Sequence, residues 1–264
     1  MSAGGRLRFF DPSTVPDDKV SVFIGKRGTG KSTGVCDLMY HHRKIPSGAA
    51  MSGTEESNKF WFKHVPDLFV YGDYEPNKII ELVEHQKKAI RKFGKDSVPA
   101  MFLLLDDCMY KKFGNDEVIR QIFMNGRHHK IFFVLTMQYA IDIPPALRGN
   151  IDYVFLCKEN SPGTQEKLYK NFGSCFKNSK QFQAVMNSLK EFEILVINVT
   201  NQSSDIRDVV SIYKPKLHGN FKIGCYEYWN YHKEHYNEKY DNDSDDEEEN
   251  EDGRRCAPLN NMLF

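Results

Sequence analysis

The chain has 264 residues, 40% of them hydrophobic, and its 36 basic residues balance its 36 acidic ones. No apolar run approaches the roughly 18 residues of a membrane span, and the first residues lack the apolar core of a signal peptide. We therefore expect a globular protein that neither crosses a membrane nor is exported by that route. Its six cysteines form no C-x-x-C pair, which excludes a zinc site of that kind and favours reduced thiols.

The balanced charge is unevenly distributed along the chain. Residues 241–252 hold nine acidic residues and no basic ones, and Arg254 and Arg255 follow. Residues 1–240 therefore keep 34 basic and 27 acidic residues, an excess of seven positive charges. We expect one folded nucleotide-binding domain over residues 1–235 and a disordered acidic tail over residues 236–264. The tail is either solvating or a regulatory mimic of DNA.

The first chemical motif follows an apolar strand pattern at residues 20–24. The stretch VSVFIGKRGTGKST matches G-x-x-x-x-G-K-[ST] at every defined position, which is the signature of a phosphate-binding loop. Glycines let backbone N–H groups approach a polyphosphate, and the following helix adds partial positive charge at its N-terminus. The expected nucleotide-binding residues are Gly25, Lys26, Arg27, Gly28, Thr29, Gly30, Lys31, Ser32 and Thr33.

Two side chains of this loop have defined expected roles. Lys31 is expected to reach the β- and γ-phosphates of ATP, and the Ser32 hydroxyl to ligate Mg²⁺. ATP and Mg²⁺ are therefore the expected cofactors.

Strand and helix patterns alternate along the rest of the chain. Strands are expected at residues 20–24, 48–53, 68–72, 100–107, 130–136, 152–158, 192–198 and 209–214. Helices are expected directly after the phosphate-binding loop and at residues 54–65, 76–93 and 118–129, and two more are expected within residues 161–190. Such alternation predicts an α/β fold with a mostly parallel central sheet covered by helices on both faces. In the last helical pair, aromatic residues are expected in the core and lysines in solvent, with DNA contact as the alternative.

Two further strands end in polar residues that suit phosphoryl chemistry. The apolar run MFLLLDD ends in Asp106 and Asp107, at the strand edge where open α/β sheets bind ligands. Asp106 is expected to hold Mg²⁺, and Asp107 to orient or deprotonate the attacking water. Gln138 ends the next strand, where its amide can position that water.

Two arginines precede later strands and are candidates for an arginine finger. Arg127 lies immediately before the strand that ends near Gln138, and Arg148 precedes the one after it. A guanidinium is always charged and binds phosphate oxygens in a fork, which stabilises charge in phosphoryl transfer. Because both arginines enter at the edge opposite the phosphates, either is expected to act across a subunit interface. Arg127 is the first candidate.

Other nucleotide-binding classes lack their signatures in this chain. The guanine motif N-K-x-D, the ABC motif L-S-G-G-Q and the DEAD-box tetrapeptide are all absent. A P-loop kinase with a small acceptor remains an alternative, although the expected arginine-rich lid is not evident. A nucleotide-dependent scaffold with little turnover is a second alternative.

Several stretches together resemble the DNA-packaging ATPases of nucleocytoplasmic large DNA viruses, a branch of the FtsK/HerA-type translocases. They are FIGKRGTGKST, SGTEESNKFWFKHVPDLFVYGDY, LLLDD and NGRHHKIFFVLTMQYAIDIPPALRGNIDYVF. The resemblance implies a RecA-like core, a ring that is commonly a hexamer, and ATP-driven translocation of double-stranded DNA into viral capsids. It also implies capsid or membrane-vertex partners and a place at viral assembly sites in the host cytoplasm, or in the virion.

The acidic pair departs from the pattern of many ring ATPases, in which Glu follows the metal-binding Asp. Asp107 is shorter by a methylene. Glu55, expected at the same sheet edge, is therefore a second candidate for the catalytic base after Asp107.

Overall fold

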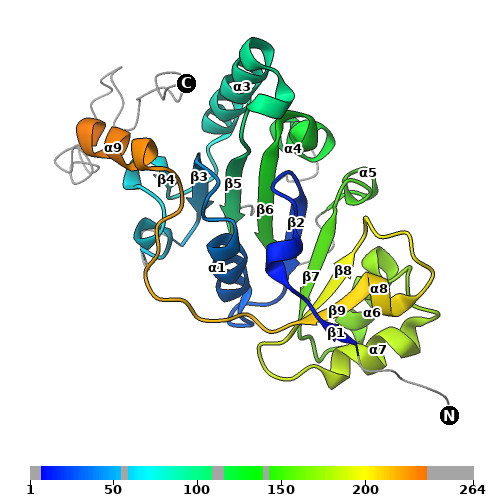
Figure 1. Ribbon diagram of the computed structural model, residues 1–264. Helices are drawn as coiled ribbons and strands as arrows, with labels where there is room; N and C mark the ends of the chain where they lie inside the picture. The colour runs from blue at the N-terminus through cyan, green and yellow to red at the C-terminus, as the bar shows by residue number, and fades with distance from the viewer. Residues whose placement is uncertain (1–6, 55–58, 109–115, 139–142, 237–264) are drawn as a thin grey trace.

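A nine-stranded sheet with the order β1-β9-β8-β7-β2-β6-β5-β3-β4 organises the part of the chain that the structure describes (Figure 1). The structure is a computed structural model, and it describes residues 7–54, 59–108, 116–138 and 143–236. The strands are β1 (Arg8–Phe9), β2 (Val20–Ile24), β3 (Ser47–Ser52), β4 (Val70–Tyr71), β5 (Met101–Asp106), β6 (Ile131–Met137), β7 (Tyr153–Cys157), β8 (Ile194–Asn198) and β9 (Val210–Tyr213).

Helices connect most of these strands. The α-helices are α1 (Lys31–His41), α3 (Pro76–Phe93), α4 (Glu117–Asn125), α5 (Pro145–Arg148), α6 (Pro162–Phe172), α7 (Ser179–Ser188), α8 (Ile206–Val209) and α9 (Tyr226–His235). Short 3-10 turns are η1 (Pro12–Thr14), η2 (Trp61–Lys63), η3 (Asp67–Phe69), η4 (Lys95–Ser97) and η6 (Gly126–His129). No helix of the described residues is both long and apolar enough to cross a membrane.

The sheet is parallel except at β8, which runs against both of its neighbours, β7 and β9. Through α1 the chain moves from β2 to β3, and through α4 it moves the other way along the sheet, from β5 to β6. Since parallel crossovers are right-handed, these opposite directions place α1 and α4 on opposite faces. The mostly parallel sheet, the helices on both faces and the P-loop NTPase fold expected from the sequence are confirmed.

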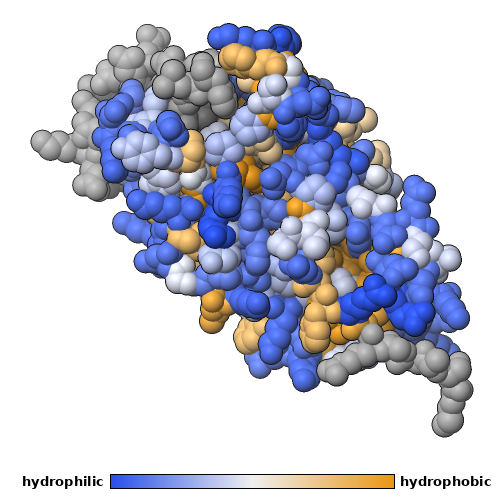
Figure 2. Space-filling view, viewed as in Figure 1, coloured by the Kyte–Doolittle hydropathy of each residue, from blue (hydrophilic) through white to orange (hydrophobic). Residues whose placement is uncertain are grey.

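The central strands are apolar because both of their faces are covered. Every residue of β2, β5 and β6 is buried, as continuous apolar runs in a parallel sheet predict. The face of the molecule in Figure 2 is mostly hydrophilic, with separate apolar patches. The buried hydrophobic residues of the described chain form one core cluster around these strands.

Some expected elements differ in the structure. Residues 59–65 of the expected helix 54–65 hold only the single turn η2, and residues 55–58 lie outside the described residues. The expected strand 68–72 begins with η3 and shortens to β4. Phe69 of η3 packs on Tyr228 of α9, with ring centroids 4.6 Å apart. Neither β1 nor α9 was expected. The acidic tail, apart from Tyr236, lies outside the described residues.

The segment after β9 is attached to α1 through the buried carboxylate of Asp37. Its Oδ2 accepts hydrogen bonds from the Tyr213 hydroxyl at 2.6 Å and from the Lys216 amide at 3.0 Å. Its Oδ1 lies 2.5 Å from Nε2 of His218. The Asp37 side chain of α1 thereby holds the segment that leads from β9 to α9.

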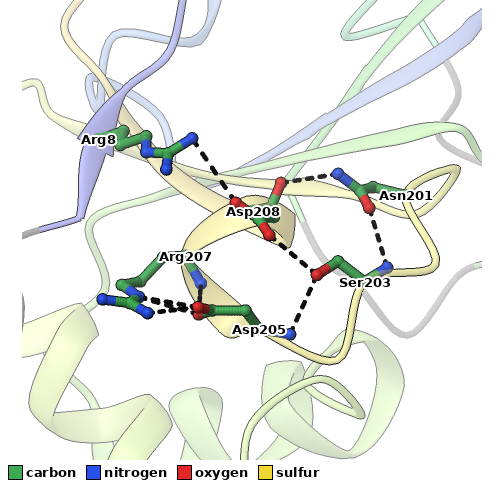
Figure 3. Close-up of polar contacts among 6 residues, drawn as sticks. All are labelled: Arg8, Asn201, Ser203, Asp205, Arg207 and Asp208. Carbon is green, nitrogen blue, oxygen red and sulfur yellow. Dashed lines mark hydrogen bonds and ion pairs between the residues drawn. The ribbon is translucent and has the colours of Figure 1, made fainter.

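Charged residues also connect the edge strand β1 to α8 (Figure 3). Arg8 lies 3.6 Å from Asp208, and Arg207 pairs with Asp205 at 2.5 Å. These side chains are exposed, so such pairs add little to stability. Hydrogen bonds from Ser203 and Asn201 to Asp208 close the loop before α8.

Candidate active site

The phosphate-binding loop lies between β2 and α1, at the edge of the sheet where the parallel strands end. Gly30 precedes the helix with φ 89°, a left-handed conformation that favours glycine. Gly25 is closely approached by β7, since a Cβ there would lie 2.5 Å from Cβ of Cys157. The Thr29 hydroxyl donates to the Lys26 carbonyl oxygen at 2.7 Å and closes the loop. The local sequence thus shapes a cradle of backbone amides.

The Lys31 side chain reaches back from the start of α1 to the beginning of the phosphate-binding loop. Its Nζ donates hydrogen bonds to the carbonyl oxygens of Gly25 at 2.8 Å and Lys26 at 3.1 Å. The side chain is only 6% exposed, and its Nζ lies 4.0 Å from Oδ2 of Asp107. The ammonium group is therefore held between the loop and the acidic pair, where a phosphate can replace the carbonyl partners.

Asp106 and Asp107 end β5 with different surroundings. The buried Asp106 accepts hydrogen bonds from the Thr136 hydroxyl at 2.7 Å and from the Trp61 indole nitrogen at 3.0 Å. Asp107 has φ 53°, a left-handed conformation that is uncommon outside glycine and that concentrates at functional sites. Its amide donates to the Thr136 hydroxyl at 3.0 Å. The two neighbouring carboxylates thus point into different parts of the site.

The donor set at Asp106 fits a magnesium ion. The pKa of Asp106 is raised, mainly by burial and also by the nearby charge of Asp107. Hydrogen bonds from Thr136, Trp61 and Ser32 oppose this shift. Among the described residues, no ion pair includes Asp106. A buried carboxylate without a protein cation, beside a hydroxyl, offers the hard oxygen ligands that Mg²⁺ prefers. Ser32 and Asp106 are therefore brought together as expected.

Gln138 follows β6 and joins Asp107. Its Nε2 donates to Oδ2 of Asp107 at 3.3 Å, so the same oxygen faces both Gln138 and Lys31. β6 lies between β2 and β5, which explains why three motifs separated along the chain meet at one sheet edge. The sequence placed these three residues in one site, and the structure places them within reach of one another.

The loop is also supported on the side of β7. Lys26 lies 3.0 Å from Glu159, which in turn accepts a hydrogen bond from the Ser161 amide at 2.7 Å. Arg27 is exposed, and Thr33 is half-buried in the first turn of α1. The segment after β7 therefore anchors the outer side of the loop.

The two arginines lie at the opposite edge of the sheet. Arg127 pairs with the buried Asp152 at 3.3 Å and donates to the Asn150 carbonyl oxygen at 3.2 Å. Asp152 also accepts a 2.9 Å hydrogen bond from the Val20 amide, where β2 begins. Arg148 donates to the side chain of Asn171. Neither arginine joins the phosphate-binding loop of its own chain.

Two residues of the site were not identified from the sequence, and one predicted residue lies outside the described part of the chain. Thr136 was not singled out from the sequence, although a polar residue inside a buried apolar strand is a signal that could have identified it. Trp61 had no such signal, because η2 reaches Asp106 only in the folded chain. Glu55 lies outside the described residues. Of the aromatic residues expected in the core of this segment, Phe172 at the end of α6 and Phe176 between α6 and α7 are buried, whereas Tyr169 is half-buried.

Comparisons with known proteins identify relatives at two levels. No family model matches the chain. An uncharacterised protein of Acanthamoeba polyphaga mimivirus is 34% identical over 248 residues, which cover 90% of this chain and 86% of the relative. An uncharacterised protein of Invertebrate iridescent virus 6 is 36% identical over 234 residues, with 86% and 90% covered.

A solved structure has the same fold. The genome packaging NTPase B204 from Sulfolobus turreted icosahedral virus 2, in complex with AMPPCP, superposes with a TM-score of 0.57. The match covers 77% of this chain and 100% of that one at 17% identity. At this identity the similarity shows the fold.

Proposed function

Because the chain belongs to the family of large-DNA-virus proteins that includes these mimivirus and iridescent-virus relatives, we propose that it is the packaging ATPase of such a virus. In this proposal it hydrolyses ATP with Mg²⁺ and uses the free energy to move double-stranded DNA into a capsid. The resemblance of its motifs to the FtsK/HerA-type packaging ATPases supports the family, and the role of B204 in genome packaging supports the packaging role.

The observation that carries the proposal is the convergence of Lys31, Asp107 and Gln138. Lys31 of α1 and Gln138, which follows β6, both lie within 4.0 Å of Oδ2 of Asp107, which follows β5. A glycine-rich cradle for phosphates lies beside them. This set combines a phosphate-binding cation, a candidate base and a neutral amide that can hold water, which is what ATP hydrolysis requires.

Each residue then has a task. Lys31 binds the β- and γ-phosphates in place of the loop carbonyls, and Ser32 and Asp106 hold Mg²⁺, which supplies charge neutralisation on the phosphate oxygens. Asp107 accepts a proton from the attacking water, and Gln138 orients that water through its amide. Glu55 stays the second candidate for the base.

A ring is proposed because both candidate fingers face away from the site of their own chain. Arg127 and Arg148 lie at the edge where strands begin, whereas the phosphates bind where strands end. A neighbouring subunit can bring one edge against the other, so that Arg127, or failing that Arg148, reaches the γ-phosphate in trans. A hexamer, capsid or membrane-vertex partners, and a place at cytoplasmic assembly sites or in the virion belong to the same proposal.

The deciding experiment compares ATPase rates with and without double-stranded DNA. A packaging motor is expected to turn over slowly alone and faster with DNA, and Lys31→Ala protein from the same preparation controls for contaminating ATPases. A rate that ignores DNA and rises with a small phosphate acceptor would instead identify a kinase. Tight ATP binding without turnover under either condition would identify a scaffold.

A further inference from the structure

Phe192 is an aromatic residue that lies beside the phosphate-binding loop without being buried. It is 56% exposed, and a Cβ on Gly30 would lie 3.3 Å from its Cδ1. It reaches the loop because β8 runs against β7, with Ile194 opposite Cys157. The start of β8 therefore lies at the edge where β2 and β7 end (Figure 1).

The backbone at Phe192 is held in a costly conformation. Its φ is 59°, which for a bulky side chain is an outlier. The turn that contains it is closed by hydrogen bonds from the Glu193 amide to the Lys190 carbonyl oxygen at 3.2 Å and from the Lys190 amide to the Glu193 side chain at 2.8 Å. Lys158 holds the same turn through the Leu189 carbonyl oxygen at 2.6 Å. The surroundings thus maintain both the strain and the exposure of the ring.

Strained residues of this kind border the loop on both sides. Asp107, with φ 53°, lies on the β5 side, and Phe192 lies on the β8 side. Strain that persists in a folded protein concentrates at functional sites. The function proposed for Asp107 is at the phosphates, which leaves the opposite side of the loop for another part of the nucleotide.

The position of the acidic pair sets the direction of the nucleotide. If ATP binds as proposed, its γ-phosphate faces Asp107 and Gln138, which belong to β5 and β6 on one side of β2. The ribose and base then extend toward the other side, where β7 and β8 lie. Phe192 is the exposed aromatic residue that the described structure offers next to the loop on that side.

We propose that Phe192 is the platform on which the base of the bound nucleotide stacks. The inference rests on the proposed function, because it assumes a nucleoside triphosphate in the loop. An apolar ring face recognises the π-face of a base and does not read its hydrogen-bonding edge. Phe192 therefore adds affinity for the nucleoside and little discrimination between adenine and guanine.

The test separates the contribution of the base to binding from that of the phosphates. Binding of a non-hydrolysable ATP analogue and of inorganic tripolyphosphate, both with Mg²⁺, is measured by calorimetry for the parent, Phe192→Ala and Phe192→Leu. Loss of stacking is expected to weaken the ATP analogue roughly 5- to 100-fold in both variants and to leave tripolyphosphate unchanged. Phe93→Ala is the matched control, because this exposed phenylalanine ends α3 just before β5 begins, at the opposite edge of the sheet.

A second variant keeps the proposal testable if truncation disturbs folding. Phe192→Trp retains a stacking face, and its fluorescence is expected to be quenched by the ATP analogue and not by tripolyphosphate. Equal weakening of both ligands, or no weakening of either, would overturn the stacking role while leaving ATP binding intact. Absence of binding of both ligands to the parent would instead contradict the proposed function.

Discussion

The indole nitrogen of Trp61 donates a 3.0 Å hydrogen bond to Oδ2 of Asp106, the carboxylate that we propose holds Mg²⁺. Trp61 is completely buried in η2, between β3 and β4. The Asp106 carboxylate at the end of β5 is thus held by a turn that is remote in the chain. Such outer partners commonly control metal affinity.

Trp61→Phe is expected to weaken Mg²⁺ binding while keeping the fold. The ring fills most of the same volume, but Oδ2 of Asp106 loses its donor, so the Mg²⁺ concentration that gives half-maximal ATPase activity should rise about 10- to 100-fold. Saturating Mg²⁺ should restore most of the rate. Trp229→Phe is the control, since that indole donates at 2.9 Å to the Ile223 carbonyl oxygen in the segment before α9. A parental Mg²⁺ dependence for Trp61→Phe would contradict the positioning role.

Substitutions at Lys31 and Asp107 should separate binding from chemistry. Lys31→Ala removes the cation on the β- and γ-phosphates and should abolish turnover. Asp107→Asn should bind ATP as the parent does and lose about 100-fold or more of the hydrolysis rate, as expected for a general base. The control is Asp96→Asn, in η4 before β5 begins. If Asp107→Asn hydrolyses ATP near the parental rate, the base lies elsewhere and Glu55→Gln becomes the variant to measure.

Arg127 has a structural contact that must be separated from a role in trans. Arg127→Ala loses the pair with Asp152, so unfolding experiments should show a loss of about 1–3 kcal/mol. Asp152→Asn loses the same pair but keeps Arg127, and its side-chain oxygen can still accept from the Val20 amide. We expect both variants to be less stable, and only Arg127→Ala to lose DNA-stimulated turnover, by on the order of 10³-fold.

Mixed rings test the trans role directly. Arg127→Ala and Lys31→Ala subunits should each be inactive alone, but co-assembled rings should regain hydrolysis where an intact Arg127 faces an intact Lys31. Failure at every mixing ratio, with co-assembly verified, would reject Arg127 and direct the same experiment to Arg148.

Acidification should destabilise the protein through His64. Burial lowers the pKa of this imidazole below its usual 6.5, and the hydrogen bond to the Phe221 carbonyl oxygen, 2.9 Å long, opposes that shift while nearby Lys63 adds to it. Between the lowered pKa of folded His64 and the unfolded value of about 6.5, this residue therefore binds more protons in the unfolded chain than in the folded one. Stability should rise with pH toward neutrality and fall as pH drops through this window.

His64→Gln isolates this contribution, because glutamine can still donate a hydrogen bond and does not titrate. Denaturant unfolding between pH 5 and pH 7.5 should show a shallower dependence on pH for the variant than for the parent. Burial also lowers the pKa of His129 and His232, which remain in both proteins. Identical pH dependences would show that His64 does not contribute.

Local patterns were enough to locate the phosphate chemistry. The spacing from Gly25 to Ser32 defines a backbone cradle, and an apolar run that ends in Asp106 and Asp107 identifies a buried strand with acids at its edge. Such features depend on neighbouring residues and on strand direction, so they can be deduced without coordinates. The family resemblance read from the motifs is confirmed by relatives over most of the chain.

Other relationships depend on which distant segments pack together. The reversal of β8 brings Phe192 to the loop, η2 brings Trp61 to Asp106, and Asp152 holds Arg127 at the far edge. Periodicity shows that a segment is a strand or a helix, but its neighbours are chosen by burial and strand pairing across the whole core. For that reason the candidate catalytic motifs were visible in the sequence, whereas the residues that contact them were identified only in the folded chain.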